Sequence, residues 1–77
     1  MSATLDKLKE LAVQRFGDRA ANIDVDADFF EALAIDSLQA LDLLTDLEDA
    51  FDVEVPDYEL QGVHTFRELA NTIETRL

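Results

Sequence analysis

Ser37 is the residue of this sequence whose surroundings most favour chemistry. It stands in the segment Ile35-Asp36-Ser37-Leu38, at the start of a leucine-rich stretch with helical spacing that runs to about Phe51. A phosphate ester on this hydroxyl would be favoured, because the open backbone N–H groups at a helix N-terminus attract negative groups. The alternative role is an N-cap, the commonest function of a serine before an amphipathic helix. A capping box is incomplete for Ser37, since the residue three positions later is Ala40.

The helix expected from Ser37 to about Phe51 has two different faces. At about 100° of rotation per residue, a broad apolar face is centred about 200° from Leu38. That face consists of Ala40, Leu41, Leu43, Leu44, Leu47, Ala50 and Phe51. Leu38 points nearly the opposite way, and its neighbours there are Asp42, Thr45, Asp49 and Asp52. A helix that only covers a core needs no leucine among carboxylates, so we interpret this side as a docking surface.

The charge of the chain favours basic protein partners. Its 77 residues include 18 acidic and 6 basic residues, for a net charge of −12. Thirteen of the acids lie between Arg19 and Arg67, where no Lys or Arg occurs. Nucleic acids and anionic membranes are poor partners for such a surface, because phosphate binding needs basic groups. Opposite charge would speed the encounter with a basic protein.

The composition also restricts catalysis, metal binding and location. The chain has no cysteine and a single histidine, His64, so thiolate or histidine metal sites and a Ser-His-Asp triad have no basis. We therefore expect no enzymatic activity and no metal site. No apolar run is long enough to span a bilayer and the N-terminus has no signal pattern, which predicts a cytoplasmic protein.

Helical periodicity predicts an all-α fold for the chain. One helix is expected over residues 3–16, ended by Gly17, and another over residues 37–51. A brief helical turn is expected from Asp57 to Leu60, ending near Gly62. The capping box of Thr65 and Glu68 then opens a last helix, whose apolar positions are Phe66, Leu69, Ala70, Ile73 and Leu77. We expect one domain over residues 1–77, a four-helix bundle with three longer helices and one short one.

A long loop is expected over residues 17–36, between the first two helices. Its alternation of apolar and polar residues imitates a strand, but no second strand is available to pair with it. We expect an extended loop held by Ile23 and Val25, followed by a short turn that Asp28 caps. That turn should bring three apolar side chains to the core, namely Phe29, Phe30 and Leu33.

Three aspartates in this loop, at positions 24, 26 and 28, suggest a calcium site. An EF-hand loop requires glycine at its sixth position and glutamate at its twelfth. Counted from Asp24, these positions hold Phe29 and Ile35. We therefore reject an EF-hand and expect weak divalent binding that relieves repulsion between the acids.

The sequence resembles the acyl carrier protein family over almost its whole length. The resemblance lies in residues 30–38, in the leucine and acid helix that ends in Phe51, in Val55-Pro56-Asp57 and in residues 65–69. It implies a four-helix bundle with a 4′-phosphopantetheine arm, derived from coenzyme A, on Ser37. Acyl groups would be carried as thioesters on the thiol of that arm, without catalysis by the chain itself. Implied partners are a phosphopantetheinyl transferase and acyl-transferring or acyl-modifying enzymes with basic docking patches.

The resemblance also suggests roles for individual residues. Those implied to contact partner enzymes are Asp36, Leu38, Asp42, Glu48 and Asp49, and the helix geometry adds Thr45 to this set. Candidates for an acyl pocket are Leu41, Leu44, Phe51, Phe66 and Ile73. Simple core packing is the favoured explanation for Leu41, Leu44, Phe51 and Ile73. Phe66 is bulkier than the residue usual in the family and would reduce the size of an acyl pocket.

Two departures from the family bear on function. Ala34 replaces the usual glycine, and alanine at a positive φ would cost about 1 kcal/mol or more, so we expect a rearranged loop. Thr45 and Asp46 stand where many fatty-acid carriers have small or apolar residues. We expect these residues to make the docking surface more acidic, and the departures together to favour a specialised pathway.

Other functions remain open from the sequence alone. The chain could be an unmodified acidic adaptor that docks through the helix of residues 37–51, or an aminoacyl or peptidyl carrier. In each case we expect a monomer. The residues do not identify the cargo, because a carrier's cargo is chosen by its enzymes.

Overall fold

The chain forms an all-α structure in which three longer helices surround a shared core. The computed structural model describes residues 3–77, apart from the side chain of Asp57. The longer helices are α1 (Ala3–Phe16), α4 (Ser37–Phe51) and α5 (Phe66–Glu74). The shorter ones are α2 (Asp18–Ala21), α3 (Phe29–Leu33) and the 3₁₀ turn η1 (Asp57–Leu60). These bounds confirm the predicted all-α fold and the helices expected over residues 3–16, 37–51 and 57–60.

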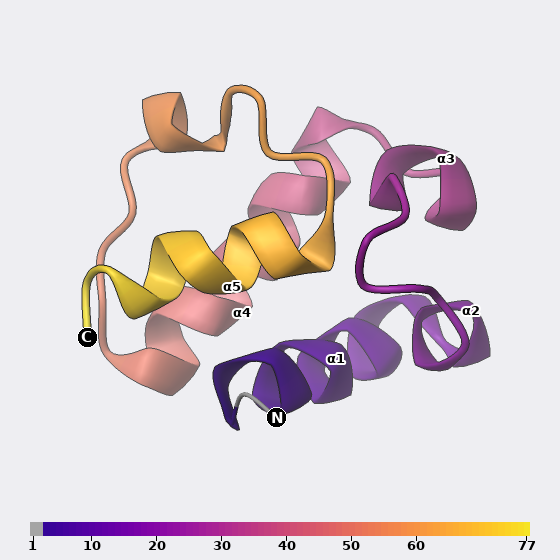
Figure 1. Ribbon diagram of the computed structural model, residues 1–77, viewed down its shortest axis with the longest axis horizontal. Helices are drawn as coiled ribbons and strands as arrows, with labels where there is room; N and C mark the ends of the chain where they lie inside the picture. Colours follow the sequence, from indigo (N-terminus) through magenta and orange to yellow (C-terminus); the bar gives the residue numbers. More distant parts are fainter. Residues whose placement is uncertain (1–2) are drawn as a thin grey trace.

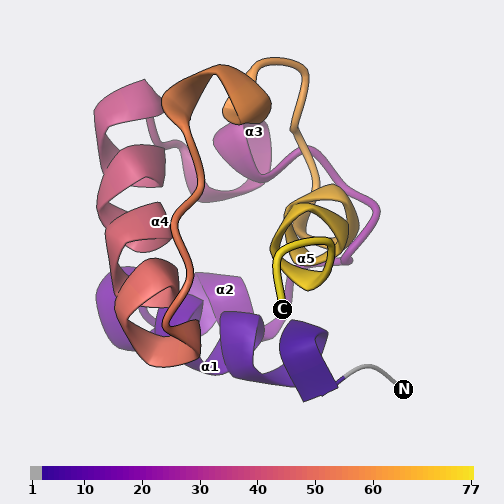
Figure 2. The same cartoon turned by 90° about the vertical axis from the view of Figure 1, so that its left-hand side faces the viewer.

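The helices cross one another around the core. In Figure 1, α1 runs below α5, and α4 passes behind α5. The turned view in Figure 2 places α4 and α5 on opposite sides, with α1 beneath them and η1 above. α1 packs against α2, α4 and α5. Within the described residues, no helix is long and apolar enough to cross a membrane.

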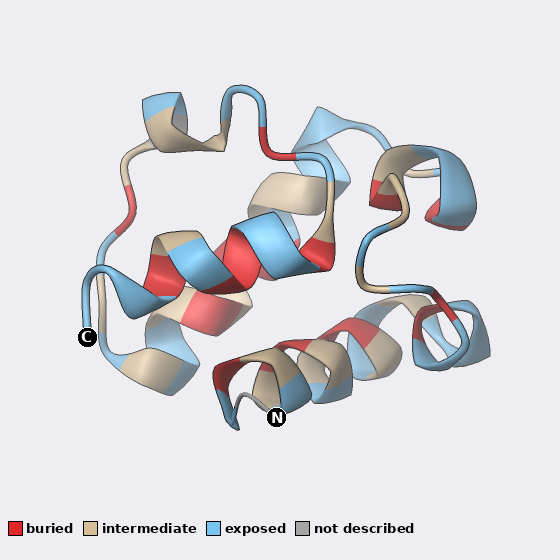
Figure 3. Cartoon of the chain, viewed as in Figure 1, coloured by how far each residue is buried: buried red, intermediate tan, exposed pale blue. Residues whose placement is uncertain are grey.

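Buried apolar side chains come from every helix except η1 and from the connections (Figure 3). Burial of a large apolar side chain contributes roughly 1.5–3 kcal/mol, so this core supplies the main stabilisation of the fold. Phe66 at the start of α5 is fully buried, and its ring lies 5.4 Å from that of Phe29. The buried apolar residues are Leu8, Ala12, Ala20, Ile23, Phe29, Leu33, Leu43, Leu44, Leu47, Val55, Val63, Phe66, Leu69, Ala70 and Ile73.

Two residues assigned to apolar faces are exposed instead. Ala50 of α4 lies at the surface. Leu77 is 66% exposed and lies beyond α5, which ends at Glu74. The N–H of Arg76 donates to the carbonyl oxygen of Ile73, only three residues back, and this tighter turn ends the α-helical pattern.

The predicted loop over residues 17–36 contains two short helices. Gly17 has a φ of 84°, which lets the chain turn directly from α1 into α2. α2 was not predicted, because a four-residue helix is too short to show periodicity. Asp28 caps α3 as predicted, since its Oδ1 accepts hydrogen bonds from the N–H groups of Phe30 at 2.9 Å and Glu31 at 3.4 Å.

The extended part of this loop is held against the start of α5. The N–H of Arg67 donates to the carbonyl of Val25 at 3.1 Å, and the N–H of Phe29 donates to His64 at 2.8 Å. These bonds satisfy backbone groups that a lone strand would leave unpaired. Ile23 is buried and Val25 is half-buried, so both hold the loop as predicted.

Ala34 ends α3 in the left-handed conformation, with a φ of 54° and a ψ of 45°. The expected rearrangement of this loop was therefore wrong. The N–H of Ala34 donates to the carbonyl of Glu31, and the chain then reverses toward α4. An alanine Cβ is sterically disfavoured in this region, so the turn before Ser37 carries strain.

Arginine side chains connect separate elements. Arg15 of α1 makes two hydrogen bonds to Asp46 of α4, with Nε–Oδ2 and Nη2–Oδ1 distances of 2.7 and 3.0 Å. The hydrogen bond from Arg15 lowers the pKa of Asp46, although desolvation opposes this effect. Arg67 likewise pairs with Asp26, at an Nε–Oδ1 distance of 2.6 Å. Asp46 therefore does not make the docking surface more acidic as expected, because Arg15 neutralises its charge.

Replacement of Ala34 by glycine should stabilise the protein. Glycine adopts a positive φ without a Cβ clash, so Ala34→Gly should raise the free energy of unfolding by about 1 kcal/mol. Urea denaturation followed by circular dichroism measures this change. Ala32→Gly is the matched control, since the exposed Ala32 lies within α3, where glycine should destabilise by roughly 0.5–1 kcal/mol. A loss of stability in both variants would contradict strain at Ala34.

The Arg15–Asp46 pair should make stability depend on pH in the acid range. The pKa of Asp46 is lower in the folded protein than in the unfolded chain. The ion pair therefore stabilises the fold fully at pH values above the unfolded-state pKa of Asp46. This stabilisation is lost as the pH falls through the folded-state pKa. Asp46→Asn should therefore slightly destabilise the protein at pH 7 and match the wild type in strong acid. Thermal denaturation across pH tests this, with Asp49→Asn as a control on the same helix. Equal destabilisation of Asp46→Asn at every pH would argue against the ion pair.

Candidate functional site

Asp36, rather than Ser37, caps the N-terminus of α4. The Asp36 Oδ1 accepts a hydrogen bond from the N–H of Gln39 at 3.0 Å. In return, the Gln39 Oε1 accepts one from the N–H of Asp36 at 3.1 Å. Together these bonds form a capping box one residue before the position considered in the sequence. Gln39, three residues after Asp36, is the sequence signal for this capping box. It was overlooked because the positions were counted from Ser37.

Ser37 is therefore the first helical residue of α4, and its hydroxyl is not used as the cap. The residue is exposed. Within the part of the chain that the structure describes, its hydroxyl makes no hydrogen bond. A cap role for Ser37 is thus excluded by the geometry, and the hydroxyl is accessible to an enzyme that modifies it.

The surroundings of Ser37 suit a phosphate ester. Backbone N–H groups in the first turn of a helix have no partner further back in the helix, and the helix dipole adds partial positive charge there. α4 has 15 residues, long enough for this dipole to develop, and its first turn contains no acidic residue. A phosphate on Ser37 would be stabilised at this end of the helix.

Leu38 is 72% exposed, which confirms that it points away from the core. Asp42, Thr45 and Asp49 are exposed on the same helix. At about 100° per residue these side chains follow one strip of α4 that starts beside Ser37. The structure therefore places an outward leucine and two carboxylates on one strip of α4, with the Ser37 hydroxyl beside the N-terminal end of that strip. We call Leu38, Asp42, Thr45 and Asp49 the α4 strip.

Three predicted contact residues also have structural roles. The carboxylate of Glu48 is half-buried and accepts a hydrogen bond from the N–H of Val55 at 2.9 Å, so it holds the segment that leads to η1. The hydroxyl of Thr45 donates to the carbonyl of Leu41 at 3.0 Å. Asp36 is exposed, although one of its oxygens is occupied by the cap. Partner contact by these three residues stays a prediction.

A pocket of about 230 Å³ opens beside Ser37. Its walls are Phe30, Ser37, Ala40, Leu41, Leu60 and Gln61. Of the acyl-pocket candidates, Leu41 lines this pocket, whereas Leu44, Phe66 and Ile73 are buried in the core and Phe51 lies half-buried at the far end of α4. Sequence reasoning missed Leu60 and Gln61, which reach Ser37 through the tertiary fold and not through helical spacing.

The interior behind this pocket is nearly filled. The void there is about 20 Å³, and it shares Phe30, Ala40 and Leu60 with the pocket at Ser37. The rings of Phe29 and Phe30 lie 4.7 Å apart and contribute to the filling. Core packing therefore accounts for the apolar faces of α4 and α5 in this conformation.

The aspartates of the loop before α3 are engaged with the protein itself. Asp24 accepts a hydrogen bond from the N–H of Asp26, Asp26 pairs with Arg67, and Asp28 caps α3. Among the side chains that the structure describes, no group of three or more potential ligands is arranged to hold a metal ion.

The chain was compared with models of known protein families. The model described as phosphopantetheine attachment site matches residues 6–73, which include the whole of α4 and nearly all of α5. This match covers far more than half of the 77 residues. An accessible serine hydroxyl at the start of a helix fits the group that this family bears. The protein therefore belongs to the phosphopantetheine attachment site family, the non-catalytic carrier domains that bear a covalent 4′-phosphopantetheine group.

Proposed function

We propose that this protein is an acyl carrier whose phosphopantetheine is attached to the Oγ of Ser37. The observation that carries this proposal is the capping of α4 by Asp36, which leaves the exposed Ser37 hydroxyl uncommitted. In the attachment step, the Ser37 Oγ–P bond forms as the diphosphate bond of coenzyme A breaks. The hydroxyl loses its proton, and the adenosine bisphosphate leaves. A phosphopantetheinyl transferase would catalyse this step.

The chain supplies no thiol of its own, because it contains no cysteine. When bound, phosphopantetheine supplies a thiol on which acyl groups are held as thioesters. Thioesters exchange readily with thiolates, so a scaffold without cysteine avoids losing cargo to its own side chains.

We infer that partner enzymes dock on the α4 strip together with Asp36 and Glu48. Leu38 would fill an apolar depression on the partner, and Asp42 and Asp49 would face its basic groups. A small contact guided by charge gives rapid binding and rapid release, which a carrier visited by several enzymes requires. The expected partners are acyl-transferring and acyl-modifying enzymes of a fatty-acid, polyketide or specialised pathway.

Membership of a carrier family favours this function over an unmodified acidic adaptor. An aminoacyl or peptidyl carrier is the remaining alternative, since both kinds of cargo use the same arm. The acidic α4 strip supports an acyl carrier with basic partners. The pairing of Asp46 with Arg15 weakens one of the reasons for a specialised pathway, because Arg15 compensates that negative charge. We retain a cytoplasmic monomer as part of the proposal.

Ser37→Ala should abolish modification without loss of stability. After incubation with coenzyme A and a broad-specificity transferase, the intact wild type should gain the mass of one phosphopantetheine and Ser37→Ala should gain none. The free energy of unfolding should change by less than about 0.5 kcal/mol, as for other surface substitutions. Removal of a true N-cap would cost about 1 kcal/mol. Equal mass gain by the variant, or no gain by the wild type, would refute the assignment of Ser37.

Leu38→Ala should impair docking but not folding. Because the side chain is 72% exposed, its truncation should change stability by less than about 0.5 kcal/mol. As an interface anchor it should contribute more than about 1 kcal/mol to partner binding, so the KM of the transferase should rise roughly tenfold. Leu77→Ala is the matched control, because Leu77 is 66% exposed and lies outside the α4 strip. If both variants behave alike in steady-state kinetics, the leucine of α4 is not an anchor.

A further inference from the structure

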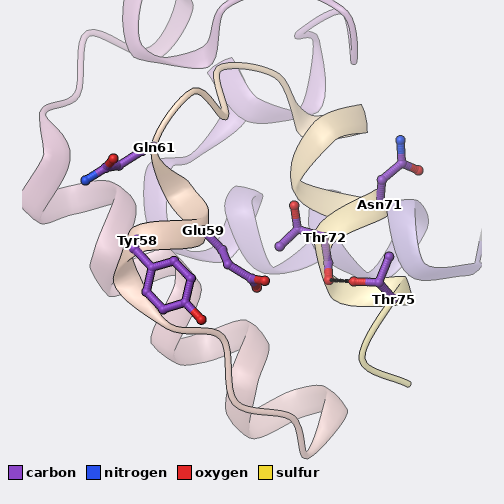
Figure 4. A pocket seen from close by; sticks show the side chains of 6 residues that line it. All are labelled: Tyr58, Glu59, Gln61, Asn71, Thr72 and Thr75. Carbon is purple, nitrogen blue, oxygen red and sulfur yellow. Dashed lines mark hydrogen bonds between the residues drawn. The ribbon is translucent and has the colours of Figure 1, made fainter.

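A shallow groove lies between η1 and α5, apart from the α4 strip. It has a volume of about 440 Å³, and Figure 4 shows the side chains that line it. From η1 and the residue after it come Tyr58, Glu59 and Gln61, and from α5 and its end come Asn71, Thr72 and Thr75. Apart from Gln61, which also lines the pocket at Ser37, none of these residues belongs to the site described above.

The groove is joined to the pocket at Ser37 through Gln61. Gln61 lines both the groove and that pocket, and its side chain points toward α4 in Figure 4. η1 has four residues, and at a rise of about 2 Å per residue it is only about 8 Å long. A flexible chain attached to Ser37 would therefore reach the groove by crossing one short turn.

The charges around Ser37 favour this direction. A phosphodiester on Ser37 is negative, and Asp42 on the first half of the α4 strip would repel it. The groove is close to neutral by contrast. Its carboxylate, Glu59, accepts a hydrogen bond from the Nε of Arg76 at 2.8 Å and forms an ion pair with it.

The polar groups of the groove match the chemistry of pantetheine, which has two amides and a hydroxyl. The hydroxyls of Thr72 and Thr75 donate to the carbonyls of Glu68 and Thr72, at 3.0 and 2.7 Å. Their oxygens therefore keep lone pairs that can accept from amide N–H groups. Gln61 offers an exposed amide that donates and accepts. Tyr58 is 69% exposed and presents both an apolar ring and a hydroxyl.

We propose that the groove between η1 and α5 is a resting site for the pantetheine part of the arm on Ser37. The proposal rests on the proposed attachment to Ser37 and adds a binding site on the chain's own surface. The groups that would contact the arm are neutral, and all of them except the half-buried Thr72 are solvent-exposed. Water therefore competes with most of these contacts, and the arm is easily released. Tyr58 and Gln61 would hold the arm between visits of partner enzymes, away from the α4 strip on which those enzymes dock.

Spin labelling of the arm tests this proposal. Because the chain has no cysteine, a nitroxide maleimide reacts only with the thiol of the attached arm. In NMR spectra of ¹⁵N-labelled protein, the paramagnetic nitroxide should broaden the backbone amide signals of Tyr58, Thr72 and Thr75 until they are lost. These signals should return when the nitroxide is reduced. A second comparison needs no label: the side-chain amide signal of Gln61 should shift between the unmodified and the modified protein.

Two variants give the test its controls. The double variant Tyr58→Ala with Gln61→Ala should restore the signals of Thr72 and Thr75, and both replaced residues are exposed, so the fold should persist. Gln14→Ala, an exposed glutamine on α1, should leave the broadening unchanged.

The possible outcomes separate the two proposals. Intact mass is measured first, and absence of phosphopantetheine on the wild type would overturn both of them. If the arm is attached but broadening is confined to residues 37–41, or follows the α4 strip, the resting site is refuted and the carrier function stands. Equal broadening of α5 in the wild type and the double variant would likewise refute the site.

Discussion

The reciprocal hydrogen bonds between Asp36 and Gln39 are the interaction on which the proposed attachment site at Ser37 depends. An exposed serine at the start of a helix is ordinarily used to satisfy backbone donors. Here Asp36 and Gln39 complete the cap, so the neighbouring Ser37 has no structural duty. The same bonds fix the first turn of α4 and hence the direction in which Leu38 leaves the helix. Loss of the cap would fray that turn, and the Ser37 hydroxyl would no longer be held in a fixed position relative to the α4 strip.

The acidic residues of this chain divide into two groups with different purposes. Asp26, Asp46 and Glu59 are paired with arginines that join separate elements. Exposed ion pairs are individually weak, but these three connect the loop to α5, α1 to α4, and η1 to the C-terminal end of the chain. Asp42 and Asp49 form no ion pair with an arginine among the described residues, although Arg15 attracts Asp42 at longer range. Both carboxylates remain on the surface of α4. Counting acids in the sequence cannot separate these groups, because the arginines that pair with them are distant along the chain.

Local patterns in the sequence predicted most of the fold. The bounds of α1 and α4 and the capping box at Thr65 follow from signals within a few residues of one another. The exposure of Leu38 follows from the 3.6-residue period alone. Leu77 was misplaced because periodicity does not indicate where a helix ends.

The rest of the site depends on tertiary structure. The pocket at Ser37 includes Leu60 and Gln61, which η1 brings to α4 from more than twenty positions along the chain. The conformation of Ala34 was misjudged for a related reason. A local cost of about 1 kcal/mol argues against a left-handed alanine, yet burial of Phe29 and Leu33 on α3 outweighs it. The commitment of Asp46 to Arg15 likewise appears only once α1 packs on α4.

The exposed carboxylates of Asp42 and Asp49 on α4 make the protein sensitive to ionic strength. Their mutual repulsion opposes the compact state, and dissolved ions screen it. The same screening weakens the attraction between these carboxylates and a basic enzyme surface. Added electrolyte should thus push folding and partner encounter in opposite directions. We therefore expect the carrier to function best at an intermediate salt concentration. That concentration screens the repulsion between its own carboxylates but preserves their long-range attraction to basic partner enzymes.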